Sequence, residues 1–157
     1  MEQNTNLLMT LKTMKTKTNE QQVGGNHYER LKTEPVKVFA AFNFNWFQGE
    51  ILKYVSRFQF KNGEQDLGKA IHIAQMAKDL KVGEKKKKRI KFSKLVYEKK
   101  YLSDLVEDYR KQFEYEEYMT VILIGLIEEN YLYVKEQTVK LKEKYYGKEE
   151  GTTGGRK

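Results

Sequence analysis

Hydrophobic residues recur at helical spacing through the middle of the chain. Between residues 46 and 60 the apolar side chains are three or four positions apart, at Phe47, Ile51, Leu52, Val55 and Phe58. A second stripe runs to about Leu80 and contains Leu67, Ala70, Ile71, Ala74 and Ala77. The pattern predicts helices over 46–60 and 64–80, separated at Lys61–Gly63. Trp46 is predicted to join the core with Phe47.

Local signals mark the ends of these helices. Pro35 suits the first position of a shorter helix over 35–42, because the N–H group that proline lacks would have no partner there. Asn62 is predicted to cap the following helix, and Asp66 places negative charge in its first turn, where the macrodipole favours it. Residues 23–80 are therefore predicted to form a compact helical module.

The C-terminal half also follows a helical period. Helices are predicted over 90–100 and 102–113, and one long helix over 115–146. The segment Met119–Leu126 is apolar on nearly all sides, which indicates burial on more than one face. Val121–Ile124 has the β-branching of a strand, but its helical flanks favour a helix. The predicted fold class is all-α: a helical N-terminal module plus long C-terminal helices.

Composition predicts the domain organisation. Residues 1–22 and 148–157 are polar with few apolar positions and are expected to be a flexible arm and a flexible tail. Between them lie the helical module (23–80), a basic linker (81–89) and a helical C-terminal region (90–147).

Charge narrows the choice of partners. The chain has a net charge of +8, which favours anionic partners such as nucleotides or nucleic acid. Much of the surplus lies in Lys81–Lys91, where Lys85–Arg89 is either a solvated linker or a nucleic-acid contact. The chain has no cysteine and no apolar run long enough to span a bilayer, so we expect a cytoplasmic protein with no membrane partner.

Several catalytic motifs are absent. The chain contains neither a P-loop nor a Gly-x-Gly-x-x-Gly sequence. Its two histidines, His27 and His72, are too few for a histidine metal cage, and no metal ligand is predicted. Glu114 and Glu117 match half of the Mg²⁺-binding pattern of helical nucleotide pyrophosphatases, and the second half does not follow.

Cationic residues gather on both sides of the break between the two central helices. Lys53 and Arg57 are four positions apart and share a helix face, and Lys61 lies in the break. Asp66 and Lys69 follow in the first turns of the next helix. If the two helices form a hairpin, these groups converge close to a helix N-terminus, which favours a bound phosphate.

Plainer interpretations remain open for each of these groups. Lys53 and Arg57 have the pattern of a solvated helix face. Asp66 has the position of an ordinary helix N-terminal charge. His27 and Tyr28 follow a Gly-Gly turn, and either hold a base or sugar or close that turn onto the first helix.

Four sequence segments together resemble a known family. They are Val23-Gly24-Gly25-x-His27-Tyr28, Pro35, Gly49-x-Ile51-x-Lys53-Tyr54-Val55-x-Arg57 and Lys61-Asn62-Gly63-x-x-Asp66-Leu67-x-Lys69-Ala70. Their order and spacing resemble the small bacteriophage domain found in phage nucleotide kinases, over about residues 23–80. Two positions depart from that family: Glu50 replaces its usual Asn, and an aromatic residue usual after Lys69–Ala70 is absent.

The resemblance implies a function. Members with an assigned activity phosphorylate deoxynucleoside monophosphates without a Walker motif and tend to oligomerise. It therefore implies a phage-encoded, homo-oligomeric nucleotide-binding protein of the host cytoplasm, with nucleoside monophosphate kinase activity as the finer expectation. ATP and Mg²⁺ would be needed for such a kinase. The alternatives are a non-catalytic binder that sequesters a host signalling nucleotide, and a nucleic-acid-binding accessory protein.

The hypothesis of a nucleoside monophosphate kinase assigns a role to each candidate residue. Asp66 and Arg57 are the catalytic candidates, with Asp66 orienting the acceptor or a metal. The ligand-binding candidates are His27, Tyr28, Lys53, Arg57, Lys61 and Lys69, of which the cations would neutralise phosphate charge.

Overall fold

Every regular element in the described part of the chain is a helix. The computed structural model describes residues 30–84, 91–94 and 99–147. Its elements in chain order are α2 (Pro35–Phe42), α3 (Trp46–Arg57), the 3₁₀ turn η2 (Phe58–Phe60), α4 (Glu64–Asp79), α6 (Lys100–Arg110), α7 (Glu116–Ile127) and α8 (Tyr131–Tyr146). The all-α prediction is confirmed. None of the described helices combines the length and apolar character that crossing a membrane requires.

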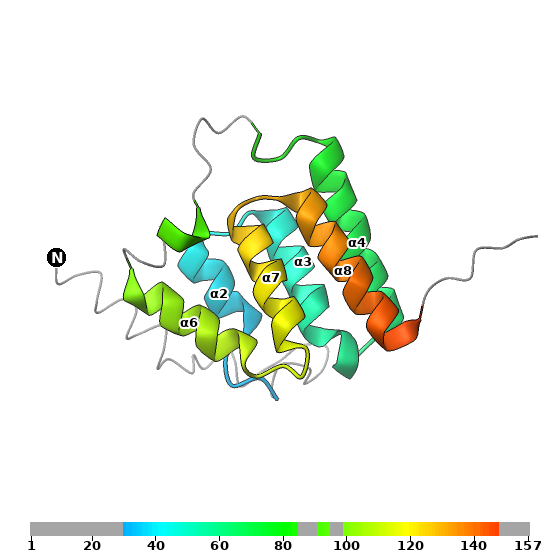
Figure 1. Ribbon diagram of the computed structural model, residues 1–157, viewed down its shortest axis with the longest axis horizontal. Coiled ribbons are helices and arrows are strands. Elements are labelled where there is room, and N and C mark those ends of the chain that lie inside the picture. Colours follow the sequence, from blue (N-terminus) through cyan, green and yellow to red (C-terminus); the bar gives the residue numbers. More distant parts are fainter. Residues whose placement is uncertain (1–29, 85–90, 95–98, 148–157) are drawn as a thin grey trace, which may run out of the picture.

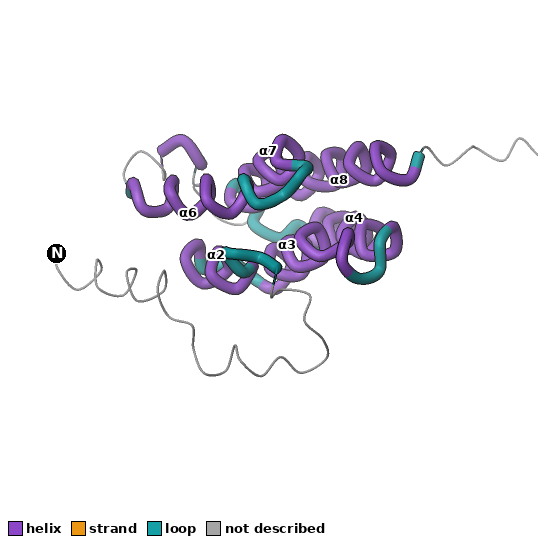
Figure 2. The backbone as a smooth tube through the Cα atoms, turned by 90° about the horizontal axis from the view of Figure 1, so that it is seen from below, coloured by secondary structure: helices purple, strands orange, loops and turns teal. Residues whose placement is uncertain are grey.

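The α-helices named above form two layers. Figure 2 shows α2, α3 and α4 in one layer and α6, α7 and α8 in the other. Each helix of the first layer packs on one of the second: α2 on α6, α3 on α7 and α4 on α8. Figure 1 shows α4 and α8 running side by side along one edge of the molecule. The first half of the chain therefore buries its apolar face against the second half.

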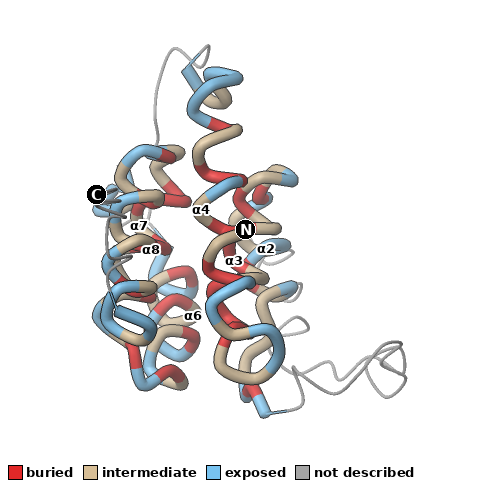
Figure 3. The backbone as a smooth tube through the Cα atoms, turned by 90° about the vertical axis from the view of Figure 1, so that its right-hand side faces the viewer, coloured by how far each residue is buried: buried red, intermediate tan, exposed pale blue. Residues whose placement is uncertain are grey.

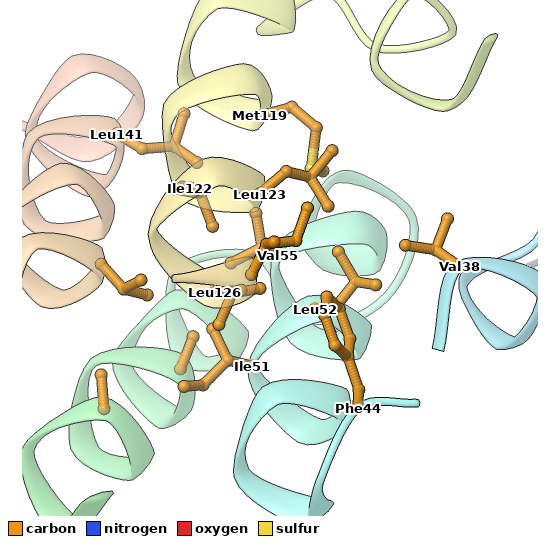
Figure 4. Packing of buried hydrophobic residues seen from close by; sticks show 14 of the residues in the cluster. Val38, Phe44, Ile51, Leu52, Val55, Met119, Ile122, Leu123, Leu126 and Leu141 are labelled. Carbon is orange, nitrogen blue, oxygen red and sulfur yellow. The ribbon is translucent and has the colours of Figure 1, made fainter. Parts of the chain in front are cut away.

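The core lies between the two layers, where the buried positions of the helices face one another (Figure 3). Ile51, Leu52 and Val55 of α3 have no exposed surface, and they meet Ile122 and Leu126 of α7 (Figure 4). These are positions of the stripe that the sequence predicts for α3. Helix α7 also packs against α6 and α8, which explains why it is apolar on nearly all sides.

The prediction of a single helix over 115–146 is wrong. The chain turns between α7 and α8, where Glu129 has a positive φ of 53°. The Asn130 amide donates to the Gly125 carbonyl at 2.8 Å, which closes the end of α7. The Asn130 side chain then accepts from the Tyr133 amide at 3.2 Å and caps α8. Asn130 is the local signal that marks this break.

The start of α3 fixes the position of that turn. Asn45 and Gln48 form a capping box at the N-terminus of α3. The Gln48 side chain is buried and donates to the Leu126 carbonyl at 2.6 Å. Asn45 also donates to the Tyr131 hydroxyl at 3.0 Å. Polar side chains therefore join α3 to the α7–α8 turn across the two layers.

Buried tyrosines hold the protein together at both ends of α3. The Tyr115 hydroxyl donates to the Val55 carbonyl at 2.7 Å, and its ring lies 5.0 Å from that of Phe58. Burial raises the pKa of Tyr115 well above its ordinary value. Burial likewise raises the pKa of Tyr131 to about 12. Both phenols therefore stay protonated in the folded protein at pH values where they ionise in the unfolded chain.

This difference predicts a loss of stability at high pH. Below pH 10 both states hold these protons and the contribution is complete. As the pH rises from about 10 to 12, the unfolded chain ionises first, so the free energy of unfolding should fall by up to about 1.4 kcal/mol per pH unit for each buried tyrosine. Urea unfolding at pH 9, 10 and 11 measures the slope. Tyr131→Phe should have a shallower slope than the original chain, and an equal slope would contradict the assignment.

Candidate anion-binding site

Three cations from two helices meet around one tyrosine ring. Helix α3 carries Lys53, Tyr54 and Arg57, and α4 contributes Lys69. The Lys53 ammonium lies 4.8 Å from the centre of the Tyr54 ring, the Arg57 guanidinium 4.7 Å and the Lys69 ammonium 5.4 Å. Cations at such distances are attracted to the face of an aromatic ring. We call Lys53, Arg57 and Lys69 the cation cluster.

A buried carboxylate holds two of these cations in place. The Asp66 side chain has no exposed surface. It accepts from Arg57 Nε at 3.0 Å and from Asn62 Nδ2 at 3.2 Å, and Lys69 Nζ lies 3.7 Å away. Asp66 therefore positions Arg57 and Lys69 beside Tyr54.

The predicted cap of α4 is wrong. Gly63, with φ of +52°, is the N-cap residue and offers no side chain. The Asn62 side chain instead donates to Asp66, which needs the hydrogen bond because it is buried. Asn62 thus belongs to the support of the cation cluster.

Glu50 adds an internal anion at the edge of the cluster. It forms an ion pair with Lys53, one turn further along α3. The two side chains are 24% and 32% exposed, so both remain accessible to a ligand. By comparison, Arg57 is 13% exposed and is largely committed to Asp66. An incoming anion would meet Lys53 and Lys69 first.

Two concavities lie beside the cluster. An open groove of about 780 Å³ runs between α3 and α4 and is lined in part by Tyr54, Lys69 and His72. A mostly apolar pocket of about 490 Å³ lies between α2 and α3, and Lys53 is on its rim. Trp46 and Glu50 line both, so the groove and the apolar pocket share a wall.

The structure brings together most of the predicted site. Lys53, Arg57, Lys69 and Asp66 are neighbours, as the helix-hairpin argument requires. Lys61 is exposed in the turn between η2 and α4, and the cation cluster forms without it.

Two parts of the prediction are not described by the structure. His27 and Tyr28 lie outside the described residues, as does the whole of the basic run Lys85–Arg89. Across the described ranges, no group of three or more His, Asp or Glu side chains is arranged to hold a metal ion.

Sequence reasoning missed two residues that shape the site. The sequence could have indicated Tyr54, because it follows Lys53 directly and lies three residues before Arg57 on the same helix. The prediction that Trp46 joins the core is wrong, because 56% of its surface is exposed. It precedes the buried stripe of α3 and faces the two concavities instead.

Comparison with known proteins matches one part of the chain to a family. Residues 23–75 match the model of DUF3310, which is described as a protein family of unknown function. The match includes α2, α3 and most of α4, and with them the whole cation cluster. No curated protein and no solved structure matches the chain. The link to phage nucleotide kinases stays a prediction.

The support by Asp66 can be tested through stability. Asp66→Ala should lower the free energy of unfolding by about 3 kcal/mol, because it leaves the mostly buried Arg57 without its carboxylate. Asp79→Ala is the matched control, since Asp79 is an exposed residue of the same helix that accepts from Gln75. Its effect should be about 0.5 kcal/mol or less. Urea unfolding of both variants gives the comparison, and equal effects would show that Asp66 has no special structural role.

Proposed function

We propose that this protein binds a nucleotide, with the phosphate at the cation cluster and the base in the adjoining apolar pocket. The observation that carries the proposal is the convergence of Lys53, Arg57 and Lys69 on the Tyr54 ring, next to a pocket with apolar walls. A nucleotide has the same two-part character, because it joins a charged phosphate to a flat, largely apolar base.

The charges of the site favour a single phosphate group. Lys53 and Lys69 are the more accessible cations of the cluster, and the more deeply buried Arg57 adds positive charge beside them. Glu50 and Asp66 offset part of that charge. A bound phosphate would replace Glu50 as the partner of Lys53, exchanging one anion for another of higher charge. Nearby cations and ring faces then hold the ligand without any covalent chemistry from the protein.

Phosphoryl transfer is the finer part of the proposal. In that reaction the bond between the β,γ-bridging oxygen and the γ-phosphorus of ATP breaks, and a phosphate oxygen of the monophosphate forms the new bond. Catalysis of this kind rests on positioning and on neutralising charge, which a cation cluster supplies. Mg²⁺ would enter with ATP. Because Asp66 is buried, we propose that it positions Arg57 and does not touch the acceptor.

Binding is tested with lysine variants that leave the buried pair intact. Titration calorimetry with the four deoxynucleoside 5′-monophosphates should show binding to the original chain. Lys53→Ala and Lys69→Ala should each weaken it by about tenfold or more, because each removes one charge-assisted contact. Lys78→Ala, an exposed lysine of the same helix as Lys69, is the matched control and should bind normally.

The outcome also separates the functions considered above. Product formation from ATP and the bound monophosphate would establish a kinase, whereas binding without turnover would favour a sequestering protein. If no nucleotide binds, but a single-stranded oligonucleotide does with steep salt dependence, a nucleic-acid-binding function would replace this proposal.

A further inference from the structure

The apolar pocket carries information about the base, which the nucleotide proposal leaves open. We infer that this pocket prefers a base with an exocyclic amino group, and that Glu50 is the residue that recognises it. The inference rests on the proposed nucleotide binding and adds the class of base.

The walls of the pocket suit a flat ring. Val36 and Trp46 are each 56% exposed there, and Pro35 and Phe39 complete the apolar lining. The Phe39 ring lies against the backbone of α3 at Gly49, where an added Cβ atom would be only 2.4 Å from the ring. Glycine at this position therefore lets Phe39 form a wall close to α3. Exposed aromatic rings beside a concavity are suited to stacking on a base.

The carboxylates at the pocket can only accept hydrogen bonds. They belong to Glu34, at the start of α2, and to Glu50. Among the described residues that line the pocket, the remaining charged group is Lys53, the proposed phosphate ligand. Once the phosphate occupies Lys53, the carboxylates of the rim favour a base whose edge donates N–H groups and disfavour one that presents a carbonyl oxygen there.

Phosphate binding would change the partner of Glu50. Without ligand, Glu50 is paired with Lys53. When the phosphate takes Lys53, Glu50 loses that cation while it still faces the pocket. A donor from the base would then compensate the carboxylate, and an amino group provides one. A keto group at the same place would put two acceptors together. The Glu50 carboxylate therefore gains a hydrogen bond from a base with an amino group and none from a base with a keto group there.

Deoxycytidine and deoxyuridine 5′-monophosphates form a matched pair for the test. They share sugar, phosphate and ring size, and they differ in the amino or keto group at one ring carbon and in the proton on the neighbouring nitrogen. We expect the original chain to bind the cytidine compound about tenfold more tightly, as measured by calorimetry. Glu50→Gln should reduce that ratio to about twofold, because an amide can both donate and accept.

Two further variants locate the effect. Glu64→Gln is the control, because Glu64 lines the groove but not the apolar pocket and pairs with Lys142 at 3.2 Å. It should keep the original ratio. Trp46→Ala should weaken both ligands alike by removing the stacking surface. The melting temperature of each variant, measured without ligand, confirms that it is folded.

The possible results have distinct meanings. If the original chain binds both ligands equally, or if Glu50→Gln keeps the full ratio, this inference is overturned and nucleotide binding stands. If Trp46→Ala changes neither affinity, the base lies outside the apolar pocket and the inference is again overturned. If neither compound, nor any other nucleotide, binds the original chain, the proposed function fails and the inference fails with it.

Discussion

A carboxylate that has lost all contact with water must be compensated by cations and hydrogen-bond donors, and among the described residues Asp66 is such a carboxylate. Its partners come from both sides of the α3–α4 turn. Arg57 is the last residue of α3, Asn62 lies in the turn and Lys69 is on α4. The buried charge therefore fixes how the two helices meet, and the same contacts place Arg57 and Lys69 against Tyr54. Fold and candidate site depend on one interaction.

The two-layer architecture explains how such a site stays in place. The matched family region covers α2, α3 and most of α4, which form one layer only. That layer has a long apolar face, and α7 and α8 cover it. The opposite face of α3 is thereby left to carry Lys53, Tyr54 and the two concavities. The second half of the chain thus covers the face of this layer that lies opposite the proposed binding surface.

The sequence predicted what depends on helical spacing and little that depends on tertiary contacts. The stripe of Ile51, Leu52 and Val55 located the core of α3, and the four-residue spacing of Lys53 and Arg57 placed both on one face. The break at Glu129 was missed, because the apolar pattern continues across it and the turn depends on a positive φ. The exposure of Trp46 escapes prediction for a related reason, because it depends on where neighbouring helices leave space, which no local pattern contains. The pairing of Glu50 with Lys53 is different: it is a contact between residues three apart on one helix, which their spacing could have predicted.

Trp46 has a practical consequence because it is the only tryptophan in the chain. Its indole is 56% exposed and lies on the wall shared by the groove and the apolar pocket. The emission of this single indole therefore originates at the candidate site, free of background from other indoles. Quenching or a shift in wavelength would follow occupancy directly, so the protein carries its own optical probe for screening small molecules without a label.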